Sequence, residues 1–193
     1  MNRSVIFVLA LTVVLTGCVT PKVVEQPATT VNFHQFKTVQ YKVHALPNAE
    51  YGSGEADMQY ARGTITLTDT LLAKKLESMG YSVVSESSAA DFNIDVAVTA
   101  VKPGSPAARF WVGFGAGRAI YEFEAKFTDA QGHSLGKFQG GRSYTGMEFG
   151  KAFSTRDEIQ TFAATRAVEQ IEQYMNGGGS FTKEAKASET AGR

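Results

Sequence analysis

The stretch YEFEAKFTDAQG, residues 121–132, predicts a β-hairpin, the antiparallel part of the fold. Residues 121–127 alternate between side chains suited to a core and side chains suited to water, and this period of two is typical of a β-strand with one buried face. The Asp-Ala-Gln-Gly sequence at 129–132 has the composition of a tight turn. Residues 134–142 are therefore expected to return as the partner strand.

Two amphipathic helices are predicted, one before and one after the hairpin. From residue 64 onward apolar residues recur at spacings of three and four, and Gly80 follows where a helix end favours a left-handed residue. These apolar residues are Leu72, Leu76 and Met79. The sequence TRDE at 155–158 forms a capping box before a second, broader apolar stripe. That stripe consists of Ile159, Phe162, Ala163, Val168, Ile171 and Met175.

Three shorter segments with strand character precede the hairpin, at 36–43, 81–84 and 92–99. Residues 47–63 contain prolines and glycines and are expected to form a loop or a partly helical excursion. The order of elements favours an α/β two-layer sandwich, with a mixed sheet of about five strands and two main helices on one face. We therefore expect four segments: a signal peptide at 1–17, a flexible tether at 18–31, a single α/β domain at 32–175 and a disordered tail at 176–193.

The N-terminal segment has the features of a lipoprotein signal. Arg3 precedes an apolar run at 5–15 that is too short to span a bilayer. The sequence LTGC at 15–18 resembles the bacterial lipobox, in which the cysteine thiol receives a diacylglyceryl group and becomes the first residue after cleavage. We therefore expect the mature chain to be anchored by acyl chains, such as palmitate, on Cys18.

The residue after the cysteine bears on location. By resemblance to Gram-negative lipoproteins, Val19 in place of an aspartate favours the periplasmic face of the outer membrane. In a host without an outer membrane, the same residues would place the protein on the outer face of the cell membrane. Cys18 is the single cysteine, so an exported domain has no disulfide and no thiolate ligand.

Composition excludes some classes of function. Apolar residues make up 43% of the chain, enough for a core, and Lys plus Arg equal Asp plus Glu at 19 each. This balance argues against nucleic acid as a partner. The expected partners are the membrane, through the acyl chains, and either an envelope protein or a second copy of the chain.

The glycine-rich and aromatic segment at 109–118 is the candidate contact site. Its glycines lie two residues apart and lead into a strand, which is the wrong spacing and context for a dinucleotide fingerprint or a P-loop. A glycine-rich strand or loop is one interpretation, and an exposed apolar segment that contacts a partner or lipid is the other. The candidate contact residues are Phe110, Trp111, Gly113, Phe114, Gly115 and Gly117.

No catalytic, metal or cofactor site is predicted. His34, His44 and His133 lack partners at ligand spacing, so each is interpreted as a solvated side chain. Glu122 and Glu124 could suggest an acid/base pair, but strand alternation explains both as water-facing residues. We expect a protein that is not an enzyme and that binds no cofactor and no metal.

The chain resembles a family of bacterial lipoproteins, domain-of-unknown-function family 4410. The residues that carry the resemblance are LAKKLESMGY at 72–81, ADF at 90–92, GFGAG at 113–117 and FTDAQG at 127–132. The resemblance implies a periplasm-facing α/β domain and no known catalytic residue. It is compatible with an interaction domain and also with a small-ligand or lipid binder that uses residues 109–118.

Overall fold

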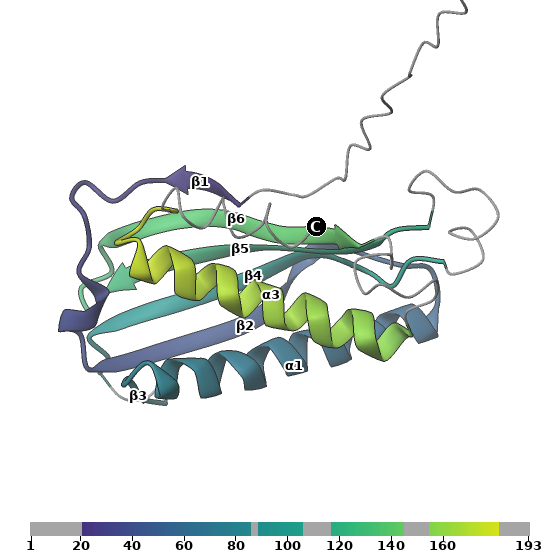
Figure 1. Ribbon diagram of the computed structural model, residues 1–193, viewed down its shortest axis with the longest axis horizontal. Coiled ribbons are helices and arrows are strands. Elements are labelled where there is room, and N and C mark those ends of the chain that lie inside the picture. The colour runs from purple at the N-terminus through teal and green to yellow at the C-terminus, as the bar shows by residue number, and fades with distance from the viewer. Residues whose placement is uncertain (1–20, 86–88, 106–116, 145–154, 182–193) are drawn as a thin grey trace, which may run out of the picture.

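The computed structural model (Figure 1) describes residues 21–85, 89–105, 117–144 and 155–181. Within these residues, no helix has both the length and the apolar character needed to span a membrane. The elements are β1 (Lys22–Glu25), the short 3₁₀ helix η1 (Phe33–Gln35), β2 (Thr38–Tyr51), α1 (Glu55–Ser78), β3 (Ser82–Val83), β4 (Phe92–Lys102), β5 (Ala119–Asp129), β6 (Ser134–Tyr144) and α3 (Arg156–Asn176).

The strands form one mixed sheet in the order β1-β6-β5-β4-β2-β3. β2 runs parallel to β3 and β4, and the remaining neighbours pair antiparallel. Figure 1 shows α1 and α3 side by side over the same face of the sheet. The predicted α/β class, the mixed sheet and the two helices on one face are confirmed, although the sheet has six strands rather than about five.

The predicted hairpin is β5 and β6, joined by a turn in which the Gly132 amide donates to the Asp129 carbonyl at 3.0 Å. Its helix-facing side chains Tyr121, Phe123, Ala125 and Phe127 are at most 1% exposed. They pack in an aromatic core with Phe138 of β6 and Tyr174 of α3, whose ring centroids lie 4.9 Å apart. Alternation along the hairpin therefore separates a buried face from a polar one, as predicted.

Helix α3 begins as its sequence predicts. The Thr155 hydroxyl accepts from the Glu158 amide at 3.1 Å, and the Glu158 carboxylate accepts from the Thr155 amide at 2.9 Å. The predicted stripe faces the core, with Phe162 only partly buried.

The prediction for residues 47–63 is wrong in detail, because β2 continues to Tyr51 and α1 already begins at Glu55. A register shift between Ala45 and Glu50 accommodates Pro47, which lacks the amide that a regular ladder needs. Residues 55–68 of α1 bury Tyr60, Ala61, Thr64 and Thr68. Two of these four are threonines, so the segment lacks the apolar periodicity that identifies a helix.

The structure also corrects the predicted tether and tail. Lys22–Glu25 pair with β6 as an edge strand, although these residues fall inside the tether expected at 18–31. Phe181 packs its ring against Phe138 at 5.1 Å and Tyr174 at 5.6 Å, so the packed domain continues into the tail expected from 176. Both segments are short, and each is ordered by contacts with β6 or α3 that its own sequence does not indicate.

Candidate functional site

The face of the sheet opposite α1 and α3 is polar and is called the open face below. It carries the residues that alternate with the core residues of β2, β4 and β5. In the described part of the chain, both helices lie on the other side of the sheet. The central open-face residues are Gln40, Lys42, His44, Asn93, Asp95, Glu124, Lys126 and Thr128.

The strand register aligns these residues in rows across the sheet. Lys42 of β2 lies opposite Asp95 of β4, and Asp95 lies opposite Lys126 of β5. In the next row, Gln40 lies opposite Asn93, which lies opposite Thr128. Three strands therefore contribute to one site, although their residues are up to 88 positions apart in sequence.

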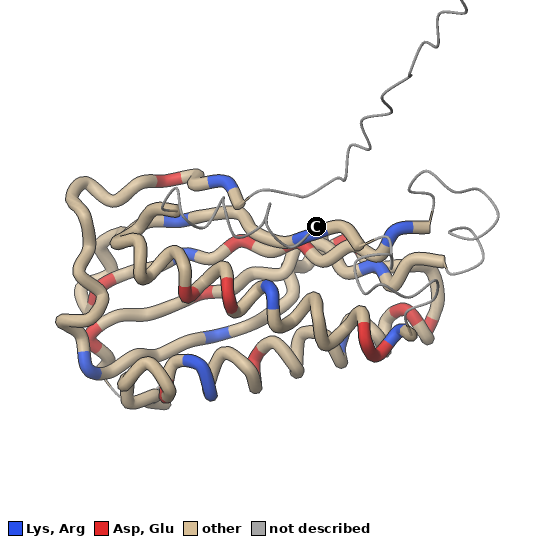
Figure 2. Tube along the Cα trace, in the orientation of Figure 1, with Lys and Arg blue, Asp and Glu red and all other residues tan. Residues whose placement is uncertain are grey.

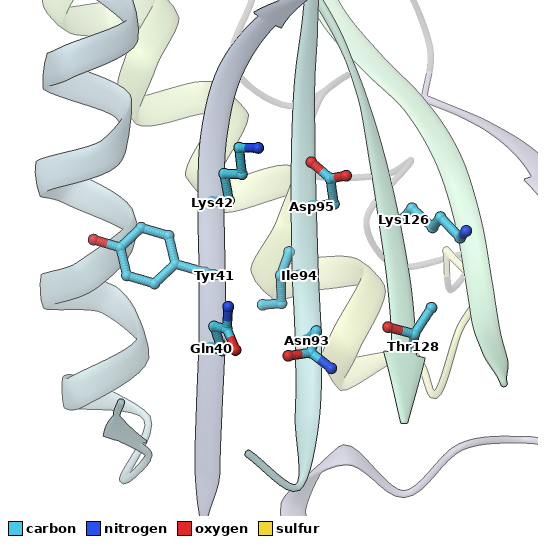
Figure 3. Close-up of a pocket in the computed structure, with 8 residues that line it drawn as sticks. All are labelled: Gln40, Tyr41, Lys42, Asn93, Ile94, Asp95, Lys126 and Thr128. Carbon is cyan, nitrogen blue, oxygen red and sulfur yellow. The ribbon is translucent and has the colours of Figure 1, made fainter. Parts of the chain in front are cut away.

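A shallow depression of about 230 Å³ lies between these two rows (Figure 3). Its lining consists of Gln40, Tyr41, Lys42, Asn93, Ile94, Asp95, Lys126 and Thr128. Tyr41 extends toward α1 and donates from Oη to the Asp69 carbonyl at 3.4 Å. Burial raises the pKa of this phenol. Of the lining residues that face the depression from the open face, none is aromatic.

Charges on the open face are only partly paired. His44 Nε2 lies 2.8 Å from the Asp95 carboxylate, and Lys137 Nζ lies 2.7 Å from the Glu124 carboxylate. Lys42 and Lys126 are exposed, and among the described residues neither has a salt-bridge partner within 4 Å. Figure 2 shows acidic and basic positions interspersed over the described part of the trace. The depression therefore offers two free ammonium groups on a molecule of balanced charge.

This chemistry suits recognition of polar or acidic groups. The side chains supply ammonium, amide and hydroxyl donors, which bind carboxylates or backbone carbonyls. Among the described residues, no group of three His, Cys, Asp or Glu side chains is arranged to hold a metal ion.

The predicted lipidation site Cys18 and most predicted contact residues lie outside the described residues, namely Phe110, Trp111, Gly113, Phe114 and Gly115. Gly117 is described: it directly precedes β5, and its carbonyl accepts from the Ser105 amide at 3.0 Å. The described structure does not bring it to the open face site.

His34 and His133 are exposed, as expected of solvated side chains, and the His133 side chain is 77% exposed. His44 differs, because only 30% of its side chain is exposed. His44 and His133 each contact a carboxylate, His44 that of Asp95 and His133 that of Asp129. The His44 contact depends on the parallel register of β2 and β4, which joins residues 51 positions apart. Sequence periodicity does not give this register, so this pair and the open-face site could not be predicted.

One family model matches the sequence of the chain. The model of the family described as "Domain of unknown function (DUF4410)" matches residues 33–146, more than half of the chain. The chain therefore belongs to this family. The match extends from η1 to two residues beyond β6 and includes every strand that contributes to the open-face depression. No curated protein matches the chain by sequence.

Several solved structures are similar at low identity. A variant of the PelC dodecamer from Paraburkholderia phytofirmans has a TM-score of 0.45 and 11% identity, over 77% of this chain and 96% of that chain. A DUF4136 family protein from Bacteroides thetaiotaomicron has a TM-score of 0.37 and 14% identity, over 81% and 96%. A DUF330 protein from Xanthomonas campestris has a TM-score of 0.38 and 12% identity, over 79% and 95%. These similarities concern the fold only.

Proposed function

We propose that the protein is a lipid-anchored component of the cell envelope that presents a non-catalytic interaction domain. Two features support this. The lipobox-like LTGC at 15–18 supplies the anchor, and the open face supplies a polar binding surface. In a host with an outer membrane, the domain faces the periplasm.

The anchor is tested by replacing Cys18 with alanine. The native chain is expected to incorporate radiolabelled fatty acid and to sediment with membranes, because two or more acyl chains hold a protein at a bilayer stably. The Cys18→Ala variant is expected to lose both properties. If the variant still sediments with membranes and carries label, the proposed anchor is wrong.

The proposed binding of a partner is assigned to the open face. The single observation behind it is the pair of exposed lysines, Lys42 and Lys126, in one row with Asp95 and without ion-pair partners in the described structure. Such residues are available for contacts across an interface, where a few charged and hydrogen-bonded groups give specificity and speed association. The partner expected from this chemistry is an envelope protein with acidic side chains at its surface.

Charge reversal on the open face tests this assignment. A Lys42→Glu/Lys126→Glu variant changes two exposed positions and should leave the core intact. A matched control, Arg62→Glu/Lys74→Glu, makes the same change in charge at exposed positions of α1. The partner that co-purifies with the native protein from crosslinked cells is expected to be lost from the first variant and retained by the control. Equal retention by both folded variants would contradict the assignment.

A further inference from the structure

The distance between the proposed acylation site and the folded domain is short. Cys18 lies four residues before Lys22, where β1 begins. A fully extended chain advances at most about 3.6 Å per residue, so these four residues reach no further than about 14 Å. If Cys18 carries the acyl chains, as proposed above, β1 stays within that distance of the bilayer surface.

β1 itself is fixed in the sheet and does not lengthen the tether. Lys22 pairs with Gln139 and Val23 pairs with Phe138, both on β6. The Val23 side chain packs against the core cluster. Residues 22–25 therefore move with the domain, and only residues 19–21 remain between the acylated cysteine and the sheet.

The exposed surface of β1 suits a lipid headgroup region. Val24 is 48% exposed. Among the described residues it is the one large hydrophobic side chain that is exposed. It lies where the β1 register shifts, between Val23 and Glu25. Lys22 is exposed two residues earlier on the same strand. An apolar side chain beside a lysine can insert at the interface while the ammonium contacts lipid phosphates.

We propose that the β1 edge of the sheet rests against the bilayer that holds Cys18. Figure 1 shows β1 along one edge of the sheet, with β3 and α1 at the opposite edge. Strand spacings of about 4.8 Å place β5, β4 and β2 roughly 10, 14 and 19 Å beyond β1. In this orientation the open-face depression on β2, β4 and β5 stands clear of the lipid and remains accessible to a partner.

Lipid quenching in vesicles tests the orientation. With Cys18 acylated, a cysteine introduced elsewhere is the only free thiol for a fluorophore. Acylated Val24→Cys and the control Lys74→Cys, which is exposed on α1, are reconstituted in phosphatidylethanolamine and phosphatidylglycerol vesicles that carry headgroup nitroxides. We expect at least about twofold stronger quenching at position 24 than at 74, because only β1 is held at the interface.

A variant with a longer tether tests whether the quenching at position 24 is caused by the short distance between β1 and Cys18. Ten glycine and serine residues inserted between residues 20 and 21 add a mean reach of about 17–19 Å. Quenching at position 24 is expected to fall to the level at 74, while acyl labelling and membrane retention stay unchanged.

The outcomes distinguish this inference from the proposed anchor. Equal quenching at positions 24 and 74 in the acylated native-length chain would overturn the orientation alone. The orientation would also be wrong if the label at position 24 were protected in a way that depends on protein concentration and not on lipid nitroxides. That result would assign the β1 edge to contact with a second copy of the chain. A chain without acyl chains on Cys18 would overturn the proposed anchor, and this inference with it.

Discussion

At the scale of single residues, Asp91 connects the starts of the parallel strands β2 and β4. Its carboxylate accepts from the amides of Lys37 and Thr38 at 2.7 and 2.8 Å, and its own amide donates to the Thr38 hydroxyl at 2.9 Å. These bonds align the first pair of the register, Val39 with Phe92. Because this register also places Lys42 beside Asp95, Asp91 supports the geometry of the open face.

The hydrogen bonds from Lys37 and Thr38 lower the pKa of the Asp91 carboxyl. Its ionised form therefore contributes stability above the unfolded carboxyl pKa of about 3.9, and this contribution is lost as pH falls through the lower folded value. We predict that Asp91→Asn lowers the urea midpoint of unfolding at about pH 7 and that the difference from the native protein shrinks as pH falls below the unfolded carboxyl pKa of about 3.9. Equal midpoints at neutral pH would contradict this role.

Two glycines with positive φ differ in what surrounds them. A Cβ at Gly80 would meet nothing within 4 Å, whereas a Cβ at Gly141 would lie 2.2 Å from the Tyr121 carbonyl oxygen. We predict that Gly80→Ala costs about 1 kcal/mol from backbone strain, and that Gly141→Ala costs about 3 kcal/mol because the neighbouring strand must also move. Chemical denaturation of both variants measures the difference. Similar losses of unfolding free energy for the two variants would show that β6 shifts at Gly141 without additional cost.

At the scale of elements, a helix could be predicted from the sequence where its buried residues form a regular apolar pattern. α3 was predicted from a capping box and an apolar stripe, both of which act locally. Residues 55–63 of α1 were not, because only Tyr60 and Ala61 are buried there and Gln160 of α3 donates to the Tyr60 carbonyl at 3.0 Å. A polar contact between α1 and α3 replaces an apolar stripe there, and it depends on tertiary structure.

The cap of α3 gives a prediction at this scale. Thr155→Ala removes the hydroxyl that accepts from the Glu158 amide and is expected to cost about 1 kcal/mol of unfolding free energy. Thr161→Ala, at an exposed position within α3, is the control and should be neutral or slightly stabilising, because alanine is the better helix former. Thermal unfolding of the two variants checks the contrast, and an equal loss in both would exclude a capping effect.

At the scale of the whole molecule, the sheet joins segments from both ends of the described chain. β1 pairs with β6, the strand that contains Phe138, and the Phe181 ring packs against Phe138. The sequence predicted the sandwich and its helices, because strand alternation and helix periodicity are local signals. It did not predict the domain limits or the open-face site, because β1, Phe181, Lys42 and Asp95 acquire their roles only through pairing between distant segments.

Truncation tests the domain limit. A chain that ends at residue 175 lacks the Phe181 ring, which packs against Phe138 and Tyr174, whereas a chain that ends at 181 keeps it. We predict that the shorter chain is less stable by about 1–3 kcal/mol, the value of burying a large apolar side chain. Phe181→Ala in the longer chain should reproduce most of this loss in denaturant unfolding. Equal stability of all three would place the domain limit at 175.

Site-specific photocrosslinking in intact cells tests whether the open face binds the partner of the anchored domain. A photoreactive residue is placed at Lys126 on the open face, or at Lys74 on the solvent side of α1, in the full acylated chain. We predict that one envelope protein is captured from position 126 and not from 74, and that Lys42→Glu abolishes the capture. Capture of that protein from position 74 and not from 126 would contradict it.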